Sequence, residues 1–321
     1  MNINVKNFVM LLNRTIICVV ILLFPCYLFG QVTTYEFFRM DMNPRAAALG
    51  GSFLTTQDDP NTVFYNPAGL TTLTSKRLSV GFFKHLIDIN AGYASFGMEV
   101  ENFGFIGAGV VYVNYGDFER TGLEGQYLGK FSAGEFALTA GYAGYLQPGL
   151  SYGINGKFIY SSIAGIGSSA AALDFGVEYV AIPDRFIVGA SILNFGTQID
   201  PYYTTREKLP LDFKIGFSVF PEHFPGVLLI DWHKLNQSVP HFLNRFKDFS
   251  VGVEFNASPN LFLRIGYNNE DRRELKIGTS SGLAGFSIGA GFLSDMYSID
   301  YAFSSLGKVG SLHRVSVGFK F

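Results

Sequence analysis

The strongest constraint on this chain is an alternation of apolar with polar or small side chains. It recurs from about residue 78 to the C-terminus. In the last segment one face carries Val315, Val317, Phe319 and Phe321, and the other carries Arg314, Ser316, Gly318 and Lys320. Because successive side chains of a strand point to opposite faces, this period predicts β-strands with one apolar face. Similar alternation occurs in residues 173–179, 249–256, 261–268 and 297–303. The period alone fits both a membrane barrel and a soluble sandwich.

The first thirty residues have the pattern of a secretory signal peptide. A basic start without acidic residues precedes an apolar run at 16–24, and Gly30 offers a small residue for cleavage. The run is shorter than the ~20 residues that a membrane-spanning helix needs. A buried N-terminal helix and a lipid-anchored cysteine at Cys26 are the alternatives. Removal of residues 1–30 would take both cysteines of the chain with it.

Composition narrows the class of protein. Charged residues make up 16%, whereas about 25% is usual in soluble domains. Aromatic residues also reach 16%, and the chain contains 37 glycines. A net charge of −2 without a basic block argues against nucleic-acid binding, and 48% hydrophobic residues exclude disorder. No later apolar stretch approaches 18 residues, so the expected membrane structure is a closed β-barrel.

The spacing of the alternating segments predicts fourteen strands, an even number as in single-chain bacterial barrels. The predicted strands are 78–85, 91–100, 103–113, 133–146, 150–161, 171–181, 185–193, 212–220, 226–233, 247–257, 260–268, 283–292, 296–303 and 312–321. Short turns at 147–149, 182–184, 258–260 and 294–295 alternate with longer segments at 114–132, 194–211, 234–246 and 269–282. We expect the short turns at the periplasmic side and the long loops outside. The terminal aromatics Phe319 and Phe321 fit an assembly signal for barrel insertion.

Residues 31–77 differ from the barrel region, 78–321. They are rich in Asn, Pro and Gly, which favour turns, and they also carry many apolar side chains that a solvated tail would not need. We therefore expect a compact hatch inside the lumen, with one short helix at most, rather than a disordered leader. The residues that mark this hatch are Arg45, Asp58, Asp59, Asn66, Pro67, Ala68 and Gly69.

Three blocks of this region, residues 45–51, 58–61 and 65–70, resemble the N-terminal signature of the PorV/PorQ family. The C-terminal blocks 300–303, 313–314 and 318–321 are similar to the ending of that family. The family belongs to the wider group of long-chain fatty-acid transporter-like (FadL-like) outer-membrane barrels. The resemblance implies a fourteen-stranded barrel with an N-terminal hatch, found in Bacteroidetes and related groups. It further implies a role in type IX protein secretion and surface attachment of cargo.

Catalytic patterns are weak. Residues 285–289 match G-x-S-x-G, but that chemistry needs a strand-to-helix turn, and this match lies in a predicted strand. Residues 165–170 resemble a dinucleotide loop without a following βαβ unit, and are better interpreted as an outer loop. Asp231 and His233 share a strand face, yet no serine with an evident role is near them in the sequence. Trp232 fits an interfacial aromatic girdle. The histidines show no metal-binding spacing, so we expect no metal, no cofactor and no enzyme activity.

Three functions remain open. The first is a non-enzymatic outer-membrane barrel that supports type IX secretion, with secretion components or secreted cargo as partners and membrane lipids around it. The second is a transporter of long-chain fatty acids or other hydrophobic small molecules, in which the hatch shifts as a ligand passes. The third is a structural outer-membrane protein. The mixed charges of the predicted lumen face, such as Asp174, Glu254 and Arg264, count mildly against the second.

Overall fold

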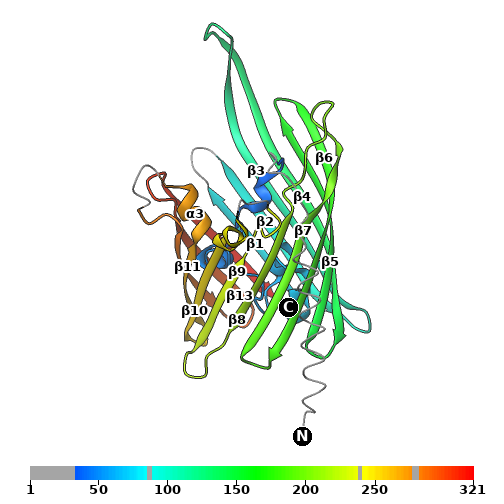
Figure 1. The fold of residues 1–321 in the computed structure, drawn as a ribbon, viewed down its shortest axis with the longest axis vertical. Coiled ribbons are helices and arrows are strands. Elements are labelled where there is room, and N and C mark those ends of the chain that lie inside the picture. Colours follow the sequence, from blue (N-terminus) through cyan, green and yellow to red (C-terminus); the bar gives the residue numbers. More distant parts are fainter. Residues whose placement is uncertain (1–32, 85–88, 238–240, 277–281) are drawn as a thin grey trace.

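The computed structural model describes residues 33–84, 89–237, 241–276 and 282–321. Within them, antiparallel strands form one closed barrel, in which each strand pairs with its neighbours in sequence and β1 pairs with β14 (Figure 1). The strands are β1 (Arg77–Lys84), β2 (Asn90–Val100), β3 (Gly104–Thr121), β4 (Tyr127–Gln147), β5 (Leu150–Ile163), β6 (Ile166–Ile182), β7 (Phe186–Asp200), β8 (Asp212–Val219), β9 (Gly226–Trp232), β10 (Phe249–Ser258), β11 (Leu261–Asn268), β12 (Phe286–Leu293), β13 (Tyr297–Ser305) and β14 (Ser311–Lys320). The predicted fourteen-stranded, all-β barrel is confirmed. The predicted signal peptide, residues 1–30, lies outside the described residues.

The two faces of the barrel follow the alternation. On β14 the side chains of Val315, Val317 and Phe319 point outward and are exposed, whereas Arg314 and Ser316 are buried toward the lumen. Closure pairs every strand on both sides, which leaves no free edge along the wall and suits a hydrocarbon environment. No helix among the described residues is long and apolar enough to cross a membrane.

The barrel has two unlike ends. Chain reversals at Pro148-Gly149, 183–185, 259–260 and 294–296 lie at one end, together with the start of β1 and the end of β14; we call this the short-turn end. The four predicted short turns are confirmed. The opposite end, called the loop end, carries the longer connections, including 201–211, 233–248 and 269–285.

The loop end is higher on one side than on the other. Strand β4 has 21 residues and β3 has 18, whereas β8 has eight, so a hairpin of β3 and β4 extends beyond the wall (Figure 1). The prediction of a loop at 114–132 is therefore wrong. Irregular register between Asn114 and Asp117 and between Glu119 and Thr121 interrupts the alternation that identifies a strand. Residues 166–170 and 194–200, also predicted as loops, continue β6 and β7.

Two of the predicted loops contain short helices. α3 (Asn269–Glu274) begins at Asn268, whose side chain accepts hydrogen bonds from the backbone N–H groups of Glu270 and Asp271. The segment η4 (Phe242–Lys247) is a 3-10 turn in the β9–β10 connection. Both lie at the lower side of the loop end (Figure 1).

Residues 33–76, called the hatch below, lie inside the barrel (Figure 1). They form η1 (Glu36–Arg39), α2 (Pro44–Ala48), η2 (Pro60–Phe64) and η3 (Pro67–Thr72), which is more helical structure than the sequence predicts. The last three elements begin in the same way. The side chains of Asn43, Asp59 and Asn66 each accept a hydrogen bond from the backbone N–H two residues later, and each is followed by proline. An Asx cap with proline at the first helical position is a strong start signal.

Candidate functional site: the hatch and the cavities around it

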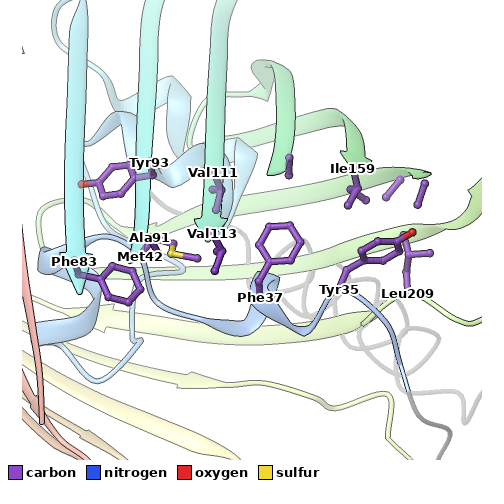
Figure 2. Packing of buried hydrophobic residues seen from close by; sticks show 13 residues of the cluster. Tyr35, Phe37, Met42, Phe83, Ala91, Tyr93, Val111, Val113, Ile159 and Leu209 are labelled. Carbon is purple, nitrogen blue, oxygen red and sulfur yellow. The ribbon is translucent and has the colours of Figure 1, made fainter. Parts of the chain in front are cut away.

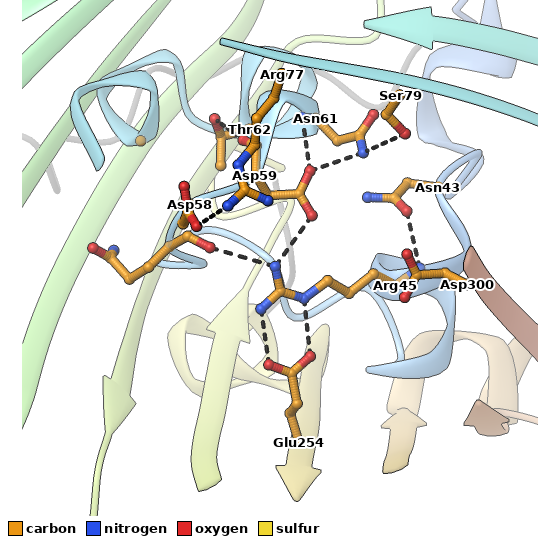
Figure 3. A network of polar contacts seen from close by, with 12 residues as sticks. Asn43, Arg45, Asp58, Asp59, Asn61, Thr62, Arg77, Ser79, Glu254 and Asp300 are labelled. Carbon is orange, nitrogen blue, oxygen red and sulfur yellow. Dashed lines mark hydrogen bonds and ion pairs between the residues drawn. The ribbon is translucent and has the colours of Figure 1, made fainter. Parts of the chain in front are cut away.

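Arg45 joins the hatch to the barrel wall. Its guanidinium binds Glu254 of β10 through two hydrogen bonds, Nε to Oε2 at 2.9 Å and Nη2 to Oε1 at 2.8 Å. Its Nη1 also donates to Asp59 Oδ2 at 3.2 Å (Figure 3). Arg264 of β11 binds the same Glu254 carboxylate at 2.6 Å and Asp300 of β13 at 2.5 Å. Paired, charge-assisted contacts of this kind fix geometry as well as contributing energy.

Asp58 holds the C-terminal end of the hatch. Its carboxylate accepts hydrogen bonds from Thr74, through both the backbone N–H at 3.1 Å and the hydroxyl at 3.0 Å, and it pairs with Arg77 of β1. Asp58 itself has a left-handed backbone with a φ of 54°. The hatch is therefore tied to the strand that immediately follows it in sequence.

The 66–69 block lies at the centre of the hatch. Asn66 Nδ2 donates to the carbonyl of Leu54 at 2.9 Å and to that of Val177 on β6 at 3.3 Å. Pro67 and Ala68 contact the wall through their backbone, and Ala68 is fully buried. Gly69 lies so close to Thr62 that a Cβ there would be 2.9 Å from its side chain. The structure thus brings together the predicted hatch residues in one layer that crosses the lumen.

Glycines of the barrel strands face this layer of the hatch. Nine lumen-facing glycines lie so close to hatch residues 48–73 that an added Cβ would come within 3 Å of a hatch atom, which real Cβ atoms essentially never do. These glycines, called the glycine seat, are Gly97, Gly107, Gly109, Gly153, Gly176, Gly189, Gly252, Gly266 and Gly289. Several are direct cross-strand partners, such as Gly153 with Gly176 and Gly252 with Gly266. The absence of side chains lets the hatch backbone lie against the wall backbone.

Asp231, weighed above as a weak catalytic candidate, has a structural contact instead. It is buried, and its Oδ2 accepts the backbone N–H groups of Phe53 at 2.7 Å and Leu54 at 2.9 Å. His233 lies beyond the end of β9, and its Nε2 is 2.7 Å from Glu270 Oε2 of α3. Burial alone would raise the pKa of Glu270, but the hydrogen bond with His233 and the charge of Lys234 hold it well below its usual range. These contacts connect the hatch and α3 to β9.

We expect Asp231→Ala to lower the free energy of unfolding by about 3 kcal/mol, because two buried N–H groups lose a charged acceptor. The chain has a single tryptophan, Trp232, whose fluorescence during urea unfolding in lipid vesicles measures this change. Asp295→Ala, in an exposed turn, is the control. Equal stability of the two variants would show that Asp231 does not hold the hatch.

The loop-end cavity has a volume of about 370 Å³ and is enclosed by the hatch, by α3 and by the wall, mainly on the side of β8 and β10 to β14. Its apolar lining includes Phe37, Phe38, Met40, Met42, Leu193 and Leu312. Phe37 packs with Tyr35, Val113 and Ile159 above the hatch layer (Figure 2). Charged side chains complete the lining, and several of them are paired: Lys157 with Asp174 at 2.9 Å, Lys214 with Asp212 at 3.7 Å, and Lys234 with Glu270.

Two further cavities lie at the short-turn end. One, of about 470 Å³ and called the turn-end cavity, is lined by Phe220, Phe224, Val227 and Phe262 together with Glu254 and Asn256. The other, of about 230 Å³, is lined mainly by polar side chains of the Arg45 network. Phe262 borders both. The hatch therefore separates an upper cavity from lower ones.

The other residues singled out in the sequence lie in the wall. Ser287, the serine of the G-x-S-x-G match, is inside β12 and hydrogen-bonds to Ser304, with no helix following the strand. Phe319 and Phe321 are exposed at the short-turn end, where an assembly signal stays a prediction. The glycine seat and the Asp231 contact were not predicted as site features. The only signal available in the sequence is glycine at lumen-facing positions of the alternating pattern. A glycine is also expected there simply as a small residue, so the pattern does not predict which glycines contact the hatch.

Comparison with known proteins gives the fold. Neither a protein-family model nor a curated protein sequence matches the chain. Among solved structures, the Pseudomonas putida toluene transporter TodX is similar, with a TM-score of 0.59 and 13% identity over 86% of this chain and 97% of that one. The chain shares the barrel fold of TodX. The monoaromatic hydrocarbon channel CymD gives a TM-score of 0.56 and 13% identity over 87% and 97%. A Pseudomonas aeruginosa FadL homologue gives 0.53 and 11% over 91% and 99%.

Proposed function

We propose that this chain is an outer-membrane channel for small hydrophobic molecules. The observation that carries the proposal is the loop-end cavity inside a barrel of this fold, where aromatic, methionine and leucine side chains form an apolar surface beside charged side chains. Binding cavities for small molecules are typically concave and mostly apolar, with a few polar groups. Its volume also falls in the range of such cavities, about 300–1,000 Å³.

The outer surface supports a membrane location. Outward side chains of β4, β5, β6 and β11, namely Leu138, Phe158, Leu173, Phe175 and Ile265, are exposed and apolar. A soluble protein rarely exposes so wide an apolar surface, whereas the hydrocarbon layer of a membrane covers it. Lipids of the outer membrane are thus the partners of this face, and export through the predicted signal peptide would deliver the chain to that membrane.

The mixed lumen charges do not oppose the proposal. The acidic side chains of Glu254, Asp300 and Asp174 are all engaged by arginine or lysine within the wall or hatch. Paired charges lose much of their cost in a dry interior. None of these three carboxylates lines the loop-end cavity, whose own charged side chains include the Lys234–Glu270 pair.

Crystals soaked with 4-bromotoluene test the binding step. We expect an anomalous bromine peak in the loop-end cavity, beside Phe38 and Leu193. Leu193→Trp should abolish the peak because the larger ring fills the cavity, whereas Ile192→Trp, on the opposite face of the same strand, should leave it unchanged. A peak that is absent from the unmodified protein would contradict the proposal.

Support of type IX protein secretion is the second candidate. The observation that favours it is the β3–β4 hairpin, which extends beyond the rim with exposed Phe118, Leu123, Tyr127 and Leu128 and offers a surface to another protein. The resemblance of the hatch blocks to the PorV/PorQ signature points the same way. Gentle-detergent purification from the native membrane, followed by mass spectrometry, tests it. Stoichiometric recovery of secretion components or secreted cargo would favour this role, and a retained hydrophobic molecule without a protein partner would count against it.

A further inference from the structure

The glycine seat has no member on β8 or β9. The one glycine of β8 at the corresponding level, Gly216, lies against Asp231 of β9 rather than against the hatch. In this sector the hatch instead meets large apolar side chains. Phe53 and Tyr65 of the hatch pack with Leu229 of β9, and Val227 packs against the same cluster. In this sector, apolar side chains rather than a wall glycine face the hatch, and the side chain of Asp231 holds the hatch backbone at Phe53 and Leu54.

This cluster lies between the loop-end cavity and the turn-end cavity. Tyr65 lines the loop-end cavity, and Val227 lines the turn-end cavity. The rings of Phe53 and Tyr65 are 4.8 Å apart between centroids, and Leu229 is almost fully buried beneath them. Side chains can change rotamer while Asp231 keeps the hatch backbone in place, so a path through this cluster needs no displacement of the hatch.

Charged groups also border the cluster: the Arg45 guanidinium lies 6.0 Å from the Phe53 ring centroid, and Lys214 Nζ lies 5.8 Å from the Tyr65 ring centroid. Asp231 Oδ2 is occupied by the Phe53 and Leu54 N–H groups, and Lys214 Nζ lies 3.7 Å from Asp212. Arg45 is bound to Glu254 and Asp59. Both cations are thus paired with carboxylates, and the members of the cluster itself are aromatic or aliphatic, which favours uncharged apolar molecules over carboxylates.

We propose that small uncharged apolar molecules cross the hatch between Tyr65 and Leu229, from the loop-end cavity to the turn-end cavity. The proposal rests on the channel function proposed above and adds its route and selectivity. The side chain of Tyr65 is the gate, and Leu229 with Val227 forms the wall past which the molecule moves. The 66–69 block, held on Gly153 and Gly176, stays in place.

Uptake of radiolabelled toluene and benzoate by intact cells tests this route, with Leu229→Trp as the blocking variant. Leu229→Trp should reduce toluene uptake about tenfold, because the added ring overfills the close-packed cluster. Leu228→Trp is the matched control, since Leu228 is the adjacent residue on β9 and points outward with 37% exposure. Cells with the Leu228→Trp variant should take up toluene as fast as cells with the unmodified protein. Benzoate uptake should stay at the level of cells with an empty vector for the unmodified protein and for every variant.

Tyr65→Ala provides a second variant that does not depend on accommodating a larger side chain. It should raise toluene uptake about threefold, because it removes the gate without touching the glycine seat. The heat-dependent gel shift of the folded barrel shows that each variant is assembled. Unchanged uptake in an assembled Leu229→Trp barrel, or in Tyr65→Ala, would overturn the route.

The outcomes separate the route from the function. If 4-bromotoluene occupies the loop-end cavity and toluene is taken up, but Leu229→Trp transports normally, then the channel function holds and the route is wrong. If the unmodified protein neither binds 4-bromotoluene nor raises toluene uptake, then the channel function itself fails. Benzoate uptake equal to toluene uptake would overturn the selectivity.

Discussion

Gly153→Val should displace the hatch and convert the barrel into an open pore. The Cβ that valine adds would lie 2.3 Å from the carbonyl carbon of Pro67 and 2.5 Å from the nitrogen of Ala68. Both atoms belong to the backbone, so no side-chain rotation relieves the overlap. We expect a loss of about 3 kcal/mol in hatch docking, at the upper end of what overpacking costs.

Single-channel recording in planar bilayers measures the result for Gly153→Val. The unmodified protein should show little ion conductance, and the variant should show long-lived openings. Gly156→Val is the control, because Gly156 lies on the same strand, faces outward, and has no atom within 4 Å of an added Cβ. Equal conductance of the two variants would contradict the docking of the hatch on the glycine seat.

Arg45→Met should produce the second large effect. It removes the cation that two carboxylates share and leaves Glu254 paired with Arg264 alone. Breaking a buried pair by removing one partner costs about 3–5 kcal/mol, because the remaining charge stays buried. Because Glu254 keeps Arg264 as a partner, we expect the loss of unfolding free energy to be near the lower figure, about 3 kcal/mol.

Urea unfolding in lipid vesicles, followed through Trp232 fluorescence, measures the change for Arg45→Met. Arg185→Met is the matched control, because Arg185 also pairs with a glutamate, Glu222, but both side chains are more than half exposed. Exposed pairs contribute at most about 1 kcal/mol. A loss at Arg45 no larger than the loss at Arg185 would show that the network does not hold the hatch.

The strands were predictable wherever the alternation was uninterrupted. The predicted strands 247–257 and 260–268 lie within two residues of the observed bounds of β10 and β11, because the turn between them is short and contains proline and asparagine. The extensions of β3 and β4 were not predictable in this way, because the irregular register after Asn114 breaks the period. Local sequence also did not reveal η4 and α3, which are short helices in connections rich in charge.

The site was predictable in part. The Asn-Pro and Asp-Pro pairs at 43–44, 59–60 and 66–67 mark the hatch turns directly, because the Asx side chain and the proline act on their own neighbours. The glycine seat depends on which glycines of the lumen face lie level with the hatch, and that follows only from barrel register. The Asp231 contact joins residues 178 positions apart in sequence, so no local pattern reveals it.

Uptake of radiolabelled toluene by intact cells is the most direct test of the channel function. Cells that carry the protein in an otherwise unaltered outer membrane should take up toluene faster than cells with an empty vector, and the excess should saturate with concentration. Leu193→Trp should remove the excess, and Ile192→Trp should retain it. Equal uptake with and without the assembled barrel would contradict the account.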